Sequence, residues 1–177
     1  MGYSESNLQR RMEIENVFLQ LMREQSFDAI TVKDLTQQIR IARKTFYSYF
    51  PNKHACLDSL TDRLIYECTL DILRGMPDHL DLSCFFRIWV EFWLKNRNYL
   101  EAIQGNHMNE YLVQRLIRYI TKEYPDSPQA PTDGDMLYFY ISGLVALMMK
   151  WCREGFPLPP EEMASKLLRL AGHPLIR

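Results

Sequence analysis

The sequence has no glycine-rich loop and no recognisable nucleophile motif. Its seven glycines are isolated from one another, so they form none of the closely spaced clusters that cradle a phosphate or a dinucleotide. No serine, cysteine or threonine stands in a pattern typical of a catalytic nucleophile. The sequence therefore predicts a protein that is not an enzyme and that uses no cofactor.

Paired cysteines and long apolar segments are also missing. The four cysteines include no C-x-x-C pair, and free thiols in a reducing compartment are the simplest interpretation for a chain of this size. The most apolar run, Met136 to Met149, has fourteen residues, whereas a membrane helix needs about twenty. The N-terminal residues lack the apolar core of a signal peptide. We therefore expect a cytoplasmic protein that does not enter a membrane.

A metal site is not expected either. His107 and Glu110 have helical i,i+3 spacing, but a structural metal centre needs about four ligands. No further ligand stands beside this pair in the sequence.

An overall excess of positive charge is absent as well, because 21 basic and 22 acidic side chains give a net charge of -1. The charged side chains are unevenly distributed along the sequence, however. Residues 1–53 contain eight basic and six acidic side chains, and from Arg40 to Lys53 four are basic and none is acidic. A locally basic stretch is where contact with nucleic-acid phosphates is expected.

What the sequence does contain is helical periodicity almost throughout. Apolar residues recur every three or four positions, and no stretch alternates as a strand would. Thr31 and Asp34 have the spacing of a capping box, Pro51 stops a short helix, and Asn52 can cap the next one. The pattern predicts an all-α fold of nine helices: one ending near residue 26, then about 32–39, 42–50, 53–74, 82–95, 97–103, 108–124, 135–153 and 161–171.

The helices fall into two groups. Gly75, Met76 and Pro77 interrupt the pattern, which predicts a small domain at 1–53, a linking helix at about 53–74 and a larger helical domain at 75–177. Residues 125–134 contain three prolines and no periodicity, which is typical of a loop.

The segment with the clearest chemistry is Val32–Phe50, two short helices separated by about three residues. Such a pair packs at a steep angle and can place its second helix in the major groove of DNA. That second helix has few apolar anchors, mainly Phe46 and Phe50, and is otherwise rich in hydrogen-bonding side chains. A solvated surface helix without a DNA role is the alternative interpretation of the same composition.

Two stretches resemble the DNA-binding signature of the TetR family. Residues 27–35 (FDAITVKDL) contain a Thr-Val pair that opens a helix, and residues 41–53 (IARKTFYSYFPNK) contain a T-F-Y-x-Y-F block followed by a lysine. Residues 139–168 resemble, more loosely, the last two helices of one subgroup. The resemblance implies a helix-turn-helix domain, a homodimer formed through the last two helices, and an effector pocket enclosed by the middle ones.

The positions that match the family pattern imply nine candidate DNA contacts. Thr31 and Lys53 would lie at helix N-termini and contact phosphate. Arg43 and Lys44 would reach base edges, where an arginine can bind guanine through two hydrogen bonds. The tyrosines would contact phosphates or thymine methyl groups. The full set is Thr31, Lys33, Arg43, Lys44, Thr45, Tyr47, Ser48, Tyr49 and Lys53.

Two positions depart from the family pattern. Arg40 stands where the turn usually has glycine, and Thr36 stands where the first helix of the motif usually has alanine. A residue other than glycine at positive φ costs about 1 kcal/mol, and a distorted turn would change the direction of the second helix. The expectation is that the fold tolerates Arg40, whose side chain can also reach phosphate.

The larger domain has an interior rich in aromatic residues and methionine. The family resemblance favours a pocket for a small apolar or aromatic effector, while plain core packing is an equally good interpretation of the same spacing. The pocket candidates are Phe85, Trp89, Trp93, Met108, Tyr111 and Phe139.

Helix 135–153 is apolar nearly all round, which is more than one domain's core requires. We therefore expect a homodimer in which this helix and helix 161–171 of each chain form a four-helix interface. The interface candidates are Val145, Met149, Leu167 and Leu168.

These features predict a transcriptional repressor that binds an inverted-repeat DNA operator as a homodimer and responds to a small-molecule effector. The alternative is a TetR-like co-regulator that acts through another protein without binding DNA itself.

Overall fold

The structure is a computed structural model that describes residues 2–76, 81–124 and 134–172, and every element in these ranges is helical. The all-α class and the nine predicted helices are confirmed there. Most helix ends lie within two residues of their predicted positions, and the predicted loop at 125–134 falls largely outside the described residues. The helices are α1 (Gly2–Glu24), α2 (Val32–Ile39), α3 (Arg43–Tyr49), α4 (Lys53–Gly75), α5 (Leu82–Lys95), α6 (Arg97–Gly105), α7 (Asn109–Glu123), α8 (Gly134–Arg153) and α9 (Pro160–Gly172).

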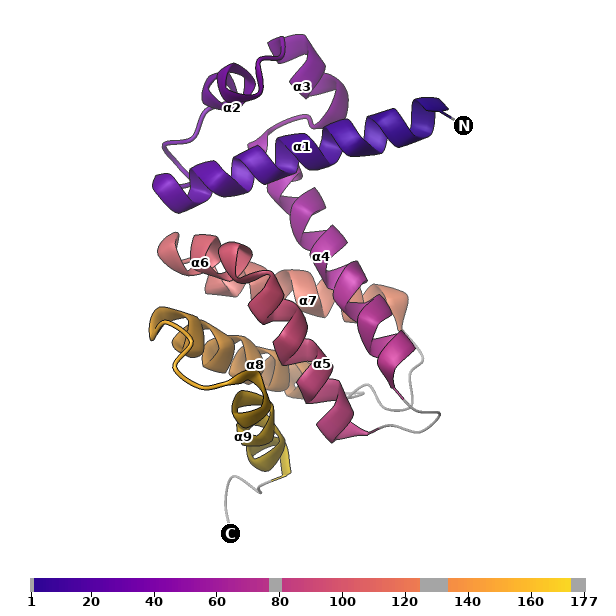
Figure 1. The fold of residues 1–177 in the computed structure, drawn as a ribbon, viewed down its shortest axis with the longest axis vertical. Helices are drawn as coiled ribbons and strands as arrows, with labels where there is room; N and C mark the ends of the chain where they lie inside the picture. Colours follow the sequence, from indigo (N-terminus) through magenta and orange to yellow (C-terminus); the bar gives the residue numbers. More distant parts are fainter. Residues whose placement is uncertain (1, 77–80, 125–133, 173–177) are drawn as a thin grey trace.

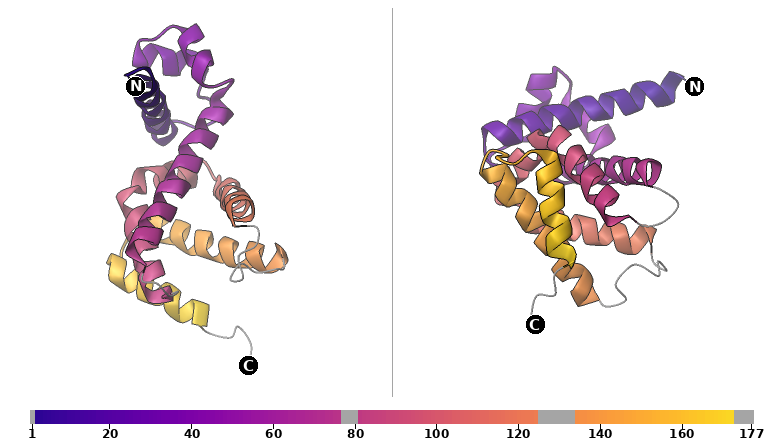
Figure 2. Two further views of the ribbon diagram at one scale, coloured as in Figure 1. Left: turned by 90° about the vertical axis from the view of Figure 1, so that its right-hand side faces the viewer. Right: turned by 60° about the horizontal axis from the view of Figure 1, so that its bottom comes forward.

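Helices α1, α2 and α3 form a small head at one end of the molecule (Figure 1). Helix α4 starts in this head and runs to the opposite end, beside the body formed by α5 to α9. Within the body α5 packs on α4 and α9, while α8 packs on α7 and α6. In the side view of Figure 2, α7 and α8 project from the column that α4, α5 and α9 form.

Local hydrogen bonds fix the helix ends in the head. The Thr31 hydroxyl accepts from the Asp34 amide and the Asp34 carboxylate accepts from the Thr31 amide, so the predicted capping box is present. This hydrogen bonding from Thr31 lowers the pKa of the Asp34 carboxyl below its ordinary value. The Asn52 side chain accepts from the Ala55 amide at 2.9 Å and thereby caps α4.

Helix α2 ends at Arg40, which adopts the left-handed conformation with φ 61° and ψ 45°. The Arg40 and Ile41 amides donate to the carbonyls of Gln37 and Thr36, and this pattern closes a regular helix end. Thr36 is buried, and its hydroxyl donates to the Lys33 carbonyl. Both departures from the family pattern are therefore accommodated without distorting the turn.

One continuous apolar core joins the head to the body. Phe18, Leu35, Phe46 and Phe50 are buried in the head, and Trp89, Trp93 and Leu100 are among the buried residues of the body. The four cysteines are free thiols, and burial raises the pKa of Cys68 to about 12. In the described part of the chain, no helix is both long and apolar enough to cross a membrane.

Three of the four predicted dimer contacts are core residues of a single chain. Val145, Met149 and Leu167 each expose 2% or less of their surface, so they cannot meet a second copy. Because α8 is apolar nearly all round, its sequence did not show which face the body covers. The prediction was wrong for these three residues, whereas Leu168 is half-buried.

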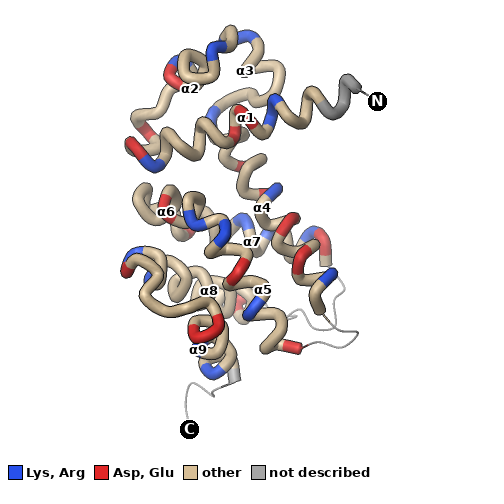
Figure 3. Tube along the Cα trace, in the orientation of Figure 1, with Lys and Arg blue, Asp and Glu red and all other residues tan. Residues whose placement is uncertain are grey.

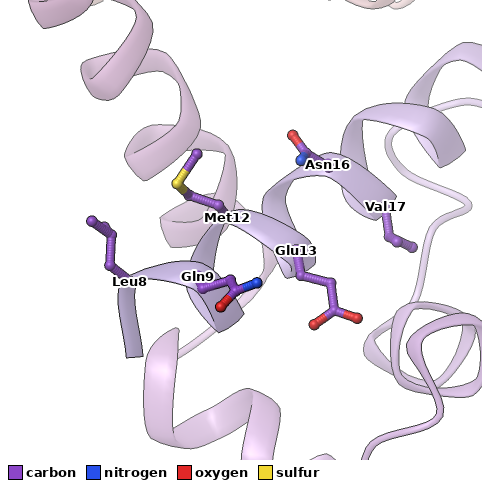
Figure 4. Close-up of a pocket in the computed structure, with 6 residues that line it drawn as sticks. All are labelled: Leu8, Gln9, Met12, Glu13, Asn16 and Val17. Carbon is purple, nitrogen blue, oxygen red and sulfur yellow. The ribbon is translucent and has the colours of Figure 1, made fainter. Parts of the chain in front are cut away.

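Of the six predicted pocket residues, Phe139 on α8 is the most exposed, at 56%. Trp89 and Trp93 are buried, and Phe85, Met108 and Tyr111 are half-buried. Two hollows open on the surface, one along α1 (Figure 4) and one where α1 meets α6. Neither hollow is lined by the predicted pocket residues.

Candidate nucleic-acid interface

Helix α3 has only seven residues and is fastened to the head by two aromatic side chains. Phe46 and Phe50 are almost completely buried, with ring centroids 5.8 Å apart. The Arg11 guanidinium lies over the Phe50 ring, 4.8 Å from its centroid. A helix this short buries only a narrow stripe, so most of its other side chains face solvent.

The exposed surface of α2 and α3 is basic. Lys33, Arg40, Arg43 and Lys44 are exposed, and from residue 35 to residue 53 the sequence has no acidic side chain. Figure 3 shows Lys and Arg positions, in blue, along α2 and α3 at the outer edge of the head. Within the described residues none of these four cations has an ion-pair partner, although acidic partners pair with several arginines elsewhere, such as Arg63 and Arg115. Their charges are therefore free to meet phosphate.

Four of the nine predicted DNA contacts use their hydrogen-bond donors inside the protein. The Thr31 hydroxyl donates to Asp34 at 2.6 Å, and the Ser48 hydroxyl donates to the Thr45 carbonyl at 2.6 Å. The Tyr49 hydroxyl donates to Asn7 of α1 at 3.1 Å. A hydroxyl has only one hydrogen to donate, so these side chains are less suited to bind phosphate than the sequence suggested.

Lys53 is the fourth of these residues, and its ammonium group makes three hydrogen bonds inside the protein. Nζ donates to the carbonyls of Phe27, Asp28 and Ile30 at 2.7, 3.1 and 2.9 Å. It also lies 4.6 Å from the centroid of the Phe27 ring, which adds a cation–π contact. An ammonium has three N–H groups, so the structure leaves none for phosphate. Lys53 instead ties the start of α4 to the segment between α1 and α2.

The other candidates remain suited to contact DNA. Arg43 and Lys44 lie in the first turn of α3, and Tyr47 follows one turn later with 52% of its surface exposed. Lys33 is exposed on α2, and Thr45 is half-buried. Arginine, lysine and tyrosine on a short exposed helix supply the donors needed to bind base edges and phosphates.

No group of three or more metal-ligating side chains occurs within the described ranges. His107, which the sequence paired with Glu110, has a φ of 56° in the turn between α6 and α7.

Two family profiles together match most of the chain. Residues 19–60 match the bacterial regulatory proteins of the TetR family, and residues 82–173 match the C-terminal region of transcriptional regulators of the same family. The second match alone covers more than half of the 177 residues. Proteins with curated descriptions gave no match.

Solved structures of TetR-type proteins have the same fold. A TetR transcriptional regulator from Streptococcus agalactiae has a TM-score of 0.69 and 17% sequence identity, with 98% of this chain and 99% of that chain covered. The fatty acid degradation regulator FadR from Bacillus halodurans has a TM-score of 0.66 and 17% identity, with 95% and 97% covered. The ketosteroid regulator KstR2 from Mycobacterium tuberculosis has a TM-score of 0.56 and 17% identity, with 91% and 92% covered.

The family profiles, the nine helices of the described residues and the exposed basic α3 agree with one another. The members of this family are transcription factors and not enzymes. The chain belongs to the TetR family of DNA-binding transcriptional regulators.

Proposed function

We propose that this regulator represses transcription by binding an inverted-repeat operator as a homodimer. The observation that carries the proposal is the exposed face of α3, where Arg43, Lys44 and Tyr47 have no ion-pair or hydrogen-bond partner within the described residues. A twofold dimer would present two such helices, and its operator would repeat the half-site after about one turn of DNA. The co-regulator alternative leaves this unpaired basic face without a role.

The test is a titration of the protein against selected operator DNA and scrambled DNA. Arg43→Ala is expected to weaken operator binding by about 1–3 kcal/mol and to relax the base preference at one position of each half-site. The reason is that an alanine cannot replace two hydrogen bonds to a base edge. Fluorescence anisotropy at several salt concentrations measures the effect. If the parent protein shows no salt-dependent DNA binding, the co-regulator alternative holds.

Two lysines provide matched controls for this experiment. Lys44 is exposed, and its replacement by alanine should lower the slope of log K against log salt by about one unit if it binds a phosphate. Lys53 is held by three carbonyls, so Lys53→Met should weaken binding to all DNA while leaving the slope unchanged. A lower slope for Lys53→Met would mean that its ammonium leaves these carbonyls when DNA binds.

We also infer that the effector is an apolar molecule with a hydrogen-bond acceptor. Trp93 is 2% exposed, and its indole N–H has no acceptor within the described residues. An unpaired buried donor is costly and favours a guest that can accept its hydrogen bond. Two proteins of the same fold are the fatty acid degradation regulator FadR and the ketosteroid transcriptional regulator KstR2, and fatty acids and ketosteroids are both largely apolar.

A long-chain fatty acid or a ketosteroid is expected to quench tryptophan fluorescence saturably and to release operator DNA. Trp93→Phe should weaken this binding about fivefold, because it removes one hydrogen bond of about 1 kcal/mol. Trp151→Phe is the matched control, since the Trp151 N–H already donates to the Leu158 carbonyl. If no fatty acid or steroid in a panel quenches fluorescence or releases DNA, the aromatic residues are plain core.

A further inference from the structure

The seam between the head and the body is formed mainly by α1 and α6. Asn106 caps the end of α6, and its side chain reaches across this seam. Its Oδ1 accepts from the Phe27 amide at 2.5 Å, and its Nδ2 donates to the carbonyls of Met22 and Ala102, each at 2.8 Å. One side chain thus bonds to the last turns of both helices and to the segment that follows α1.

These bonds meet groups that the head cannot satisfy by itself. The carbonyls of the last turn of a helix have no partner within that helix, and Met22 lies in the last turn of α1. The Phe27 amide lies beyond the helix end. A half-buried amide that satisfies both groups holds the head in one orientation, because a rotation about the seam would break two hydrogen bonds at once.

Phe27 links this contact to the DNA-binding helices. Its amide is held by Asn106, while its carbonyl accepts from Lys53 at the start of α4, directly after α3. Its ring lies against His54 and under the Lys53 ammonium. The body helix α6 and the start of α4 are therefore joined through one residue.

An ion pair crosses the same seam and is partly exposed to solvent. Arg23 of α1 bonds to Glu101 of α6 at 2.8 Å, with 41% and 36% of the side chains exposed. Exposed pairs of this kind contribute little to a fixed geometry. The hollow at the seam is lined by residues of both helices, including Met22, Glu101 and Asn106, so apolar packing alone does not fill it.

We propose that Asn106 is a positioning residue that sets the orientation of the DNA-binding head, and through it the spacing of operator half-sites that the dimer accepts. This inference rests on the proposed dimeric binding to an inverted repeat. Each added base pair moves one half-site by about 3.4 Å along the helix axis and rotates it about the axis. A head held in one orientation accepts one spacing, whereas a head free to rotate accepts several.

The test compares operators whose spacers are lengthened or shortened by one or two base pairs. Asn106→Ala should reduce the preference of the parent protein for its best spacer by about fivefold or more, while half-site base preference is kept. Arg23→Ala is the control at the same seam and should leave the spacer preference unchanged. If Asn106 has a purely structural role, Asn106→Ala should lower the stability of the protein and its overall affinity for DNA. The ratio between its affinities for the different spacers should then stay unchanged.

A second measurement reports on the contact without DNA. Hydrogen exchange at the Phe27 amide should become faster in Asn106→Ala, while the amides of buried α4 residues such as Leu60 keep their protection. If Asn106→Ala does not fold, Asn106→Asp serves instead, because it retains an acceptor for Phe27 but loses both donors.

The outcomes separate the two proposals. A folded Asn106 variant with the spacer preference of the parent overturns the positioning role. A parent protein that binds DNA without any spacer preference overturns dimeric binding to an inverted repeat. Unchanged hydrogen exchange at the Phe27 amide in Asn106→Ala overturns the Asn106–Phe27 contact as the one that holds the head, independently of DNA.

Discussion

Replacing Phe46 by alanine is expected to lower the free energy of unfolding by about 3–5 kcal/mol and to abolish DNA binding. Phe46 is completely buried, and with Phe50 it supplies the aromatic anchoring of a helix only seven residues long. The cavity left by the lost ring cannot be filled by α3 itself, since its remaining side chains face solvent or are half-buried. A loss of this size is a large part of the 5–15 kcal/mol that stabilises a typical protein.

The measurement is denaturant unfolding followed by circular dichroism, with DNA titration of the folded fraction. Tyr47→Ala is the matched control, because Tyr47 is adjacent in sequence, aromatic and exposed. It should change stability by less than about 0.5 kcal/mol but still weaken DNA binding. If Phe46→Ala unfolds at the denaturant concentration of the parent, α3 is held by contacts other than this ring.

The helix ends were predictable because local chemistry determines them. Thr31, Asp34 and Asn52 make the capping bonds that their spacing predicts. Arg40 takes the left-handed conformation at the position where the family pattern has glycine. Such signals involve residues three or four positions apart, which a single sequence displays directly.

The sequence could not show in the same way whether the hydrogen-bond donors of each candidate DNA contact are free or already bonded inside the protein. Lys53 is saturated by carbonyls that lie 23 to 26 residues earlier in the chain, and the Tyr49 hydroxyl meets Asn7 across the head. Asn106 carries no periodic or motif signal, since an asparagine after a helix resembles an ordinary cap. Its role follows only from the approach of α6 to α1.

The prediction of which α8 residues face a second copy failed for a related reason. Hydrophobic periodicity identifies a buried face only when the opposite face is polar, and α8 has apolar residues on both. The structure resolves the ambiguity by packing α8 on α6 and α7, while α9 packs on α5. The buried face carries Val145 and Met149, and the uncovered face is a different set of residues.

That uncovered face is where we expect the dimer to form. Four large apolar side chains near the start of α8 are 43–56% exposed, and Leu170 on α9 is 47% exposed. Large apolar side chains exposed to this extent are unfavourable in water, and several of them on one helix are typical of a protein interface. A second copy would cover it, because a twofold interface brings the same face of each chain together. The four residues on α8 are Met136, Tyr138, Phe139 and Tyr140.

Replacing Phe139 by glutamate is therefore expected to convert the dimer into monomers and to weaken operator binding by about a hundredfold or more. A charge placed at the centre of a buried apolar interface has no partner, and leaving a buried charge unpaired costs about 3–5 kcal/mol. Since Phe139 is 56% exposed in one chain, the monomer fold should survive. Sedimentation at micromolar concentration measures the oligomeric state, and circular dichroism checks the fold.

Tyr66→Glu provides the matched control, because Tyr66 is an aromatic residue on α4 with a similar exposure of 53%. It introduces the same charge away from α8 and α9 and should leave both the dimer and DNA binding intact. Val145→Glu is not a suitable probe, since Val145 is 2% exposed and a glutamate there would disrupt the core. A parent protein that sediments as a monomer, or a Phe139→Glu variant that remains dimeric, would contradict an interface on this face of α8.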